Sequence, residues 1–152
     1  MATYTTATTA NNIPAVGGSS IPRVMSAVIN MSTQTNSAGD IFEMLEIPAN
    51  TLVLCSGIDI LSADTAGNSG TVILGDGSDD NRYVAAAATT SAGQMTPVTS
   101  TGTNYVYAAA DTIDIKTATG AMNGLLRAWA VVASLDSQGL KTDTDSQTLT
   151  FA

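Results

Sequence analysis

Apolar and polar residues alternate along much of this chain, and the alternation has the period of a β-strand. It is clearest in three segments, at residues 24–31, 40–47 and 112–117. Successive side chains of a strand point to opposite sides of the sheet, so each segment is predicted to bury one face. In the third segment, Ile113 and Ile115 are expected in the core. Asp114 and Lys116 are expected to face solvent.

The densest β signal follows in the middle of the chain, where it predicts two hairpins end to end. The first would join residues 51–61 to residues 71–74 through a turn rich in Gly, Asn and Ser, residue types that suit tight turns. The second would join residues 71–74 to residues 82–88. Strict alternation places four residues on the core face of the first strand: Leu52, Leu54, Ile58 and Ile60. Gly57, within that strand, indicates a bulge or a close backbone approach.

Two further segments complete the pattern. Residues 105–110 repeat the Tyr-Val and Ala-rich sequence of residues 83–88, which suggests strands at equivalent places in two sheets. Residues 124–135 are apolar on both faces, as in a strand covered on two sides. Arg127 and Trp129 share one of these faces, and a buried Arg needs a partner. They are predicted to lie at a subunit boundary or a sheet edge; an ordinary core position for Trp129 is the alternative.

These strands account for residues 23–135, and both ends of the chain differ from them in composition. Residues 1–22 are rich in Thr, Asn, Gly and Pro without an apolar period, which predicts an extended N-terminal arm. Residues 136–152 are predicted to form a polar C-terminal tail, which could add one edge strand at residues 149–151. The chain is therefore expected to form one all-β domain, a β-sandwich of about eight or nine strands.

Composition then excludes several classes of function. The chain has no histidine and one cysteine, so His-dependent triads, the usual His/Cys zinc sites and intrachain disulfides are excluded. That cysteine, Cys55, lies among apolar residues and is expected to be an inert thiol. The net charge is −8 and the five basic residues are scattered, whereas nucleic-acid binding needs clustered cations. No membrane partner is expected either, since no apolar run approaches the roughly 18 residues of a spanning helix.

The remaining candidate for chemistry is an acidic turn in the middle of the chain. Asp76, Asp79 and Asp80 bring together hard oxygen ligands of the kind that Ca²⁺ prefers. The segment departs from the EF-hand loop, because Asn81 stands where that loop needs Gly and Ala87 where it needs a bidentate Glu. A solvated turn is therefore favoured over a metal site. No cofactor is expected, and no catalytic residue is assigned.

Three segments carry a resemblance to a known family: IPANTLVLCSGIDIL at 47–61, TVILGDGSDDNRYV at 71–84 and LLRAWAVVASL at 125–135. They resemble small structural proteins in the virions of tailed phages, above all the head decoration, or cement, proteins of cyanophages and related marine phages. The resemblance implies a jelly-roll sandwich, usually a homotrimer. It also implies a place on the outer surface of the phage head, where the protein clamps neighbouring major capsid proteins. The family has no catalytic residues.

On that resemblance, the expected function is to decorate and stabilise an icosahedral phage capsid without catalysis. The expected interface residues are those of the arm, together with two on the last strand: Ile13, Pro14, Val16, Ile21, Arg127 and Trp129. A tail, fibre or host-attachment protein on the same sandwich is the alternative. A calcium-assisted, carbohydrate-active sandwich is a third hypothesis. The N-terminus lacks the basic and apolar regions of a signal peptide, so a place in the virion rather than export is expected.

Overall fold

The computed structural model describes residues 3–5, 22–67, 70–93 and 102–135. Within these ranges the chain forms nine strands and a short 3-10 helix. They are β1 (Thr3–Thr5), β2 (Arg23–Asn30), η1 (Met31–Thr33), β3 (Ile41–Ile47), β4 (Thr51–Ser62), β5 (Thr71–Asp76), β6 (Val84–Ala88), β7 (Tyr105–Tyr107), β8 (Asp111–Thr117) and β9 (Leu125–Ser134). No helix in the described ranges is long and apolar enough to cross a bilayer.

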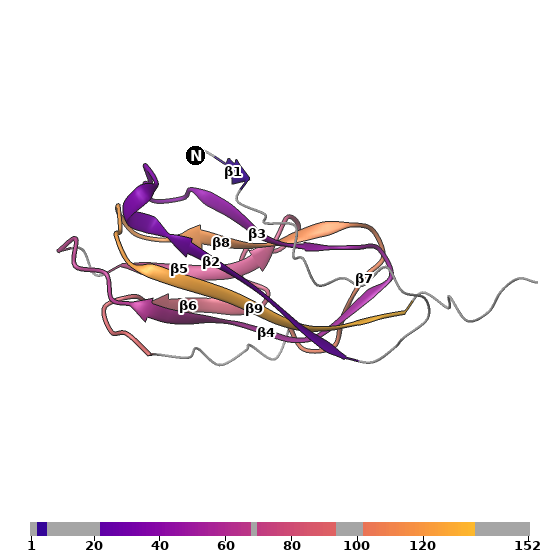
Figure 1. Cartoon of the computed structure of the whole chain (residues 1–152). Coiled ribbons are helices and arrows are strands. Elements are labelled where there is room, and N and C mark those ends of the chain that lie inside the picture. The colour runs from indigo at the N-terminus through magenta and orange to yellow at the C-terminus, as the bar shows by residue number, and fades with distance from the viewer. Residues whose placement is uncertain (1–2, 6–21, 68–69, 94–101, 136–152) are drawn as a thin grey trace, which may run out of the picture.

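The strands form two sheets that pack face to face (Figure 1). The order is β2-β9-β4-β7 in the four-stranded sheet and β1-β3-β8-β5-β6 in the five-stranded sheet. All of these pairs are antiparallel except β1 with β3. From β2 to β9, the chain changes sheet at every connection except that between β5 and β6. This is the strand order of a jelly roll, which confirms the predicted all-β, jelly-roll sandwich.

The hairpin predictions have opposite outcomes. β5 and β6 pair as the second hairpin predicts. The first hairpin is wrong, because β4 and β5 lie in different sheets. A hairpin turn and a crossing between sheets both need residues that allow a sharp change of direction, so the local sequence does not distinguish them. The two Tyr-Val segments do take equivalent places. The first leads into β6 and the second contains β7, and each of these strands lies at one edge of its sheet.

The core lies between the two sheets and is built from the inward-facing side chains of both. Its largest fully buried residues are Tyr83, Phe42, Met31, Met44, Leu45, Ile47, Ile58, Ile60, Leu74, Ile113, Ile115 and Leu126. The alternation predicts this core well in β8, where Ile113 and Ile115 are buried. In β9 a strand covered on two sides was predicted, but only the even-numbered residues from 126 to 132 are buried, and the odd-numbered residues from 125 to 131 are partly buried.

β-Bulges change which residues face the core. In β4 a bulge at Leu54 shifts the pairing with β9 by one residue. Before this bulge the odd-numbered Val53 faces the core and is buried. Leu52 and Leu54 are only partly buried, and their prediction as core residues is wrong. Beyond the bulge, the prediction of Ile58 and Ile60 is confirmed. One extra residue in a strand reverses the alternation that follows, and a similar shift in β3 buries two adjacent residues.

Asn36 joins the loop after η1 to the loop between β8 and β9. Its amide nitrogen donates to the carbonyl oxygens of Met31, Gln34 and Met122, at 2.9 to 3.1 Å. Its side-chain oxygen accepts a bond from the Met122 amide at 2.7 Å. Asn36 is only 7% exposed, so water does not readily replace these bonds. The same loops border a shallow depression of about 530 Å³.

Replacing Asn36 by Ala should lower the free energy of unfolding by about 1–2 kcal/mol, because buried backbone groups lose their partner. Urea denaturation followed by the fluorescence of the single tryptophan measures the change. Gln34→Ala is the matched control, since the Gln34 side chain makes a hydrogen bond of 3.4 Å to exposed Thr33. Equal effects of the two variants would contradict the role assigned to Asn36.

Candidate functional site

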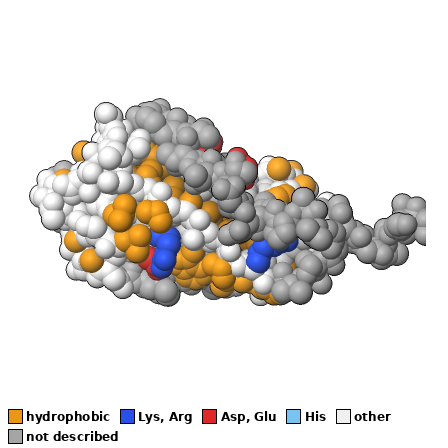
Figure 2. Space-filling model, in the orientation of Figure 1, with side chains coloured by type: hydrophobic (Ala, Val, Ile, Leu, Met, Phe, Trp, Pro, Cys, Tyr) orange, Lys and Arg blue, Asp and Glu red, His pale blue; other side chains and the backbone are white. Residues whose placement is uncertain are grey.

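The outer side of the four-stranded sheet carries a surface built from three neighbouring strands. Side chains of β2, β9 and β4 meet there in rows, because the registers of the two strand pairs align them. The rows are Val24–Val131–Cys55, Ser26–Trp129–Gly57 and Val28–Arg127–Asp59. We call these residues the outer β2–β9–β4 face. Figure 2 shows this side of the molecule, where hydrophobic side chains gather over the three strands.

Arg127 and Trp129 lie at the centre of this face. They are on β9, which pairs with β2 on one side and with β4 on the other, so the prediction of a sheet edge is wrong. Trp129 belongs to the outward-facing, partly buried residues of β9, and the alternative of an ordinary core position is also wrong. A subunit boundary at these residues stays a prediction.

Arg127 has the partner that its position requires. Its Nε donates to Asp59 Oδ2 at 2.8 Å, and its Nη2 donates to the same oxygen. Asp59 is 6% exposed, whereas the Arg127 side chain keeps 42% of its surface accessible. Gly57 pairs directly opposite Trp129 in regular register and marks no bulge.

The outer β2–β9–β4 face is apolar, exposed and incompletely hydrogen-bonded. Among the described residues, five large hydrophobic side chains are exposed, and two of them, Val24 (65%) and Val28 (53%), belong to this face. Asp59 Oδ1 and Trp129 Nε1 are buried and have no hydrogen-bond partner within the described part of the chain.

The predicted interface residues of the arm lie outside the described residues; they are Ile13, Pro14, Val16 and Ile21. Of the first 22 residues, the structure describes β1 and Pro22. β1 pairs in parallel with the start of β3, with Thr3 opposite Ile41. The N-terminal end of the chain is thus attached to the edge of the five-stranded sheet.

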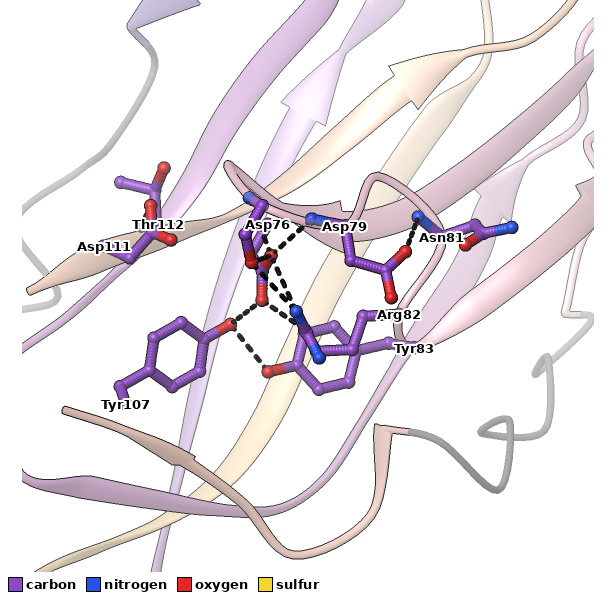
Figure 3. Close-up of polar contacts among 9 residues, drawn as sticks. Asp76, Asp79, Asn81, Arg82, Tyr83, Tyr107, Asp111 and Thr112 are labelled. Atoms are coloured by element: carbon purple, nitrogen blue, oxygen red, sulfur yellow. Dashed lines mark hydrogen bonds and ion pairs between the residues drawn. The ribbon is translucent and has the colours of Figure 1, made fainter. Parts of the chain in front are cut away.

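The acidic turn after β5 is organised around the buried carboxylate of Asp76 (Figure 3). Its Oδ1 accepts bonds from the amides of Ser78 at 3.0 Å and Asp79 at 2.8 Å, and from the Ser78 hydroxyl at 2.8 Å. Its Oδ2 accepts a bond from Arg82 Nε and one of 3.0 Å from the Tyr107 hydroxyl. One inward-facing carboxylate thus holds the whole turn.

Two tyrosines connect this carboxylate to both sheets. Tyr83 directly precedes β6, and Tyr107 ends β7, which are the edge strands of different sheets. Their hydroxyls lie 2.7 Å apart beside Asp76, as Figure 3 shows. The Arg82 guanidinium carbon lies 3.8 Å from the centroid of the Tyr105 ring, also on β7. We call Asp76, Ser78, Arg82, Tyr83 and Tyr107 the Asp76 cluster. It joins the two sheets along this side of the sandwich.

The electrostatics of the Asp76 cluster fit a structural link. Burial alone would raise the pKa of Asp76, but hydrogen bonds from Arg82, Ser78 and the backbone hold that pKa below its usual value. Burial is also the main reason why the pKa values of Tyr83 and Tyr107 are raised. At neutral pH the cluster therefore holds an ionised carboxylate, a guanidinium and two neutral phenols, which satisfy one another.

The three carboxylates that were candidates for calcium take separate partners. Asp76 points into its cluster, and Asp80 forms an ion pair with Lys116. Asp79 Oδ1 accepts a bond of 3.4 Å from the Asn81 amide. In the part of the chain that the structure describes, no group of three or more His, Cys, Asp or Glu side chains is placed to hold a metal ion.

Asp114 occupies an unexpected place on the outer side of the five-stranded sheet. It lies across from Glu43 on β3 and from Gly75 on β5. The acidic turn folds over this position, because a Cβ added to Gly75 would meet the backbone oxygen of Asp79 at 2.2 Å. Asp114 is consequently only 9% exposed, and the prediction that it faces solvent is wrong.

The setting of Asp114 disfavours its charged form. Burial raises its pKa most; a hydrogen bond with Thr112 lowers it, and the charges of Glu43, Asp111 and Asp76 raise it further. The result is a pKa of about 7. Its Oδ1 is buried without a hydrogen-bond partner among the described residues. Asp114 therefore changes its charge near neutral pH, at a position that the fold partly covers.

Sequence reasoning missed the Asp76 cluster. The two Tyr-Val repeats contain Tyr83 and Tyr107, and this repetition was the available signal. It did not show that the two hydroxyls meet, because their meeting depends on which edges β6 and β7 occupy. The acidic pattern likewise indicated a solvated turn, whereas Asp76 is 4% exposed.

No family model and no curated protein matches this sequence. Solved structures do share its fold. A chain in the capsid of Ralstonia phage GP4 has a TM-score of 0.60 and 21% identity, with 80% of this chain and 88% of that chain covered. A chain in the cyanophage Pam1 capsid asymmetric unit has a TM-score of 0.57 and 20% identity, with 85% and 98% covered.

A third chain comes from the acidic stable capsid structure of Helicobacter pylori bacteriophage KHP30. Its TM-score is 0.51 and its identity 10%, with 76% of this chain and 90% of that chain covered. At these identities, the likeness establishes a shared fold. The jelly roll described above is thus one that occurs in chains of phage capsid structures, over most of their length.

Proposed function

We propose that this chain is a non-enzymatic structural protein of a phage virion, which decorates and stabilises an icosahedral head by bridging neighbouring major capsid proteins. The observation that carries the proposal is the jelly roll shared with chains of three phage capsid structures. The match covers 98% of the cyanophage Pam1 chain, so it involves nearly a whole protein rather than a common fragment. The proposed location is the outer surface of the head, with copies acting as a homotrimer.

A protein in this role acts by linkage. If it binds the assembled shell and not the free capsid proteins, its binding free energy adds to the stability of the shell. A stable contact of this kind buries about 1,200–2,000 Å² in total. The arm and the outer β2–β9–β4 face are the surfaces that we propose for it. An extended segment can bind a partner through main-chain hydrogen bonds, while alternate apolar side chains add contact area.

Deleting residues 2–20 should leave a folded domain that no longer binds capsids. The core strands begin at Arg23, so the deletion removes the arm and β1 and leaves the rest of the sandwich. Co-sedimentation with purified capsids that lack the protein measures binding, and circular dichroism checks the fold. Undiminished binding would contradict the role of the arm.

Because this deletion also removes β1, a second variant keeps β1 and changes only apolar arm residues. Ile13→Ser with Val16→Ser should weaken capsid binding, whereas Asn11→Ser with Asn12→Ser is the matched control and should not. The number of copies per virion tests the location. Decoration of a head requires hundreds of copies, whereas a tail or fibre protein is present in a few dozen or fewer.

A further inference from the structure

Four segments that are far apart in the chain meet at one end of the sandwich, where β4 and β6 end and β5 begins (Figure 1). The Asp64 amide donates to the Thr89 carbonyl oxygen at 2.8 Å, and the Thr89 amide donates to the Gly70 carbonyl oxygen at 2.9 Å. The Asn123 amide, in the loop before β9, donates to Asp64 Oδ1 at 3.1 Å. Asp64 therefore lies where all four segments are held together.

Asp64 and Thr89 each have a buried side-chain oxygen without a hydrogen-bond partner in the described part of the chain. These atoms are Asp64 Oδ2 and Thr89 Oγ1. Asp64 is only 7% exposed, and Thr89 is fully buried. The two oxygens lie close together, because a Cβ added to Gly70 would come within 2.5 Å of both. Two unsatisfied oxygens thus share one place, beside a residue that has no side chain.

The carboxylate of Asp64 also has no positive partner among the described residues. The structure shows three ion pairs there, and Asp64 takes part in none of them. The carboxylate at the other end of β5, Asp76, receives the Arg82 guanidinium. A buried carboxylate without a counter-charge is costly, so the position beside Asp64 Oδ2 favours a cation.

We propose that Asp64 Oδ2 and Thr89 Oγ1 bind a hard metal cation of the size of Na⁺ or Ca²⁺. A carboxylate and a neutral oxygen are the kind of ligands that such cations prefer. Ca²⁺ binds oxygen at about 2.3–2.6 Å, so one ion can reach two oxygens that both lie within 2.5 Å of a single point. Mg²⁺ fits less well, since it requires a near-ideal octahedron at shorter distances.

This site is separate from the acidic turn, because Gly70 precedes β5 and Asp76 ends it. It uses one carboxylate and one hydroxyl, whereas the earlier calcium candidates were three carboxylates. The proposal does not depend on the proposed function, since an ion held inside the sandwich requires no capsid.

Water and backbone oxygens supply the other ligands that such an ion needs. Ala66 and Asn123, whose amides donate to Asp64 Oδ1, also line the depression of about 530 Å³ described above. Solvent therefore reaches the residues that border the site. A bound ion would link the connection after β4 to the end of β6, and these two strands belong to different sheets.

Thermal unfolding of the full chain, followed by circular dichroism, tests the proposal. The ionic strength is held constant with tetramethylammonium chloride, whose cation is too large for the site, and part of this salt is replaced by NaCl or CaCl₂. At least one of the two ions should raise Tm in a saturable way, by about 3–6 °C at ten times its Kd. The constant ionic strength separates binding from screening of the net charge of −8. An unchanged Tm in both salts overturns the proposal.

Two variants show whether the response belongs to this site. Asp64→Asn keeps an oxygen for the two amides and removes the charge, whereas Thr89→Val keeps the shape and removes the hydroxyl. Each should weaken ion binding by about tenfold or more, because the site has few protein ligands. Glu46→Gln is the matched control, since it removes the same charge from an exposed position and should keep the full response. A wild-type response of the Asp64→Asn chain overturns the proposal.

The Thr89→Val variant also distinguishes an ion from an ordered water at the same place. Without Na⁺ or Ca²⁺, its Tm should be no lower than that of the wild-type chain, because the substitution removes a buried hydroxyl that has no partner. With the ion at saturation, its Tm should fall below that of the wild-type chain. A difference between the two chains that is the same in every salt is the result expected for a water, and it overturns the proposal.

Discussion

The Arg82→Ala substitution should lower the free energy of unfolding at pH 7 by about 3–5 kcal/mol relative to the wild-type chain. Removing the guanidinium leaves the Asp76 carboxylate buried without its charged partner; in the native chain the Asp76 side chain is fully buried, and that of Arg82 is 13% exposed. The variant also loses the contact of Arg82 with the Tyr105 ring. Urea denaturation at pH 7 measures the change.

Lys116→Ala is the matched control for Arg82→Ala. Lys116 also pairs with a carboxylate, but its partner Asp80 has a side chain that is 50% exposed. An exposed pair contributes little, so this variant should lose less than about 1 kcal/mol. Similar losses in both variants would show that the Asp76 cluster is no more important than a surface ion pair.

The Arg82→Ala effect should also depend on pH. The pKa of Asp76 in the folded chain lies below its usual value of 3.8, so its contribution to stability is present above that pH. The contribution is lost as pH falls through the lower, folded-state pKa. The difference between the wild-type chain and the Arg82→Ala variant should therefore be largest near pH 7 and should shrink in acid.

The Asp114→Asn variant should be more stable than the wild-type chain at pH 8, by about 2–3 kcal/mol. The folded chain raises the pKa of Asp114 from 3.8 to about 7, so folding favours the protonated form. Below pH 3.8, Asp114 is protonated in both the folded and the unfolded chain and does not destabilise the fold. As the pH rises from 3.8 to about 7, Asp114 destabilises the folded chain increasingly, because only the unfolded chain ionises it easily. Asn has nearly the same shape as the protonated acid and carries no charge at any pH.

Urea denaturation of the Asp114→Asn variant and the wild-type chain at several pH values tests this prediction. The difference in unfolding free energy should be small near pH 4 and should reach a plateau above pH 7. Glu46→Gln is the matched control, since Glu46 is an exposed carboxylate on the neighbouring strand. A destabilised Asp114→Asn variant at pH 8 would contradict the inferred cost of its charge.

Much of the fold was predictable because burial follows local patterning wherever strands are regular. The alternation in β8 correctly predicted Ile113 and Ile115 as core residues. It failed in β4, because the bulge at Leu54 exchanges the two faces of the strand. A bulge depends on how the partner strand is aligned, and that alignment is a property of the sheet.

The sequence predicted some features of the candidate surfaces but not the contacts between strands. The sequence alone indicated that Arg127 and Trp129 share one face of the last strand and that Arg127 needs a partner. The identity of that partner, Asp59 on β4, required the register between β9 and β4. The apolar rows around this ion pair depend on the same register. The arm residues stay a prediction, since they lie outside the described residues.

By itself, the sequence determined an all-β sandwich, the places of most of its strands, and a chemistry without histidine or paired cysteines. These follow from side-chain period and composition, which are local properties. Only the tertiary structure decided that the acidic turn folds inward at Asp76 and covers Asp114. That outcome depends on contacts between strands far apart in the chain, because β6 and β7 reach Asp76 from different sheets.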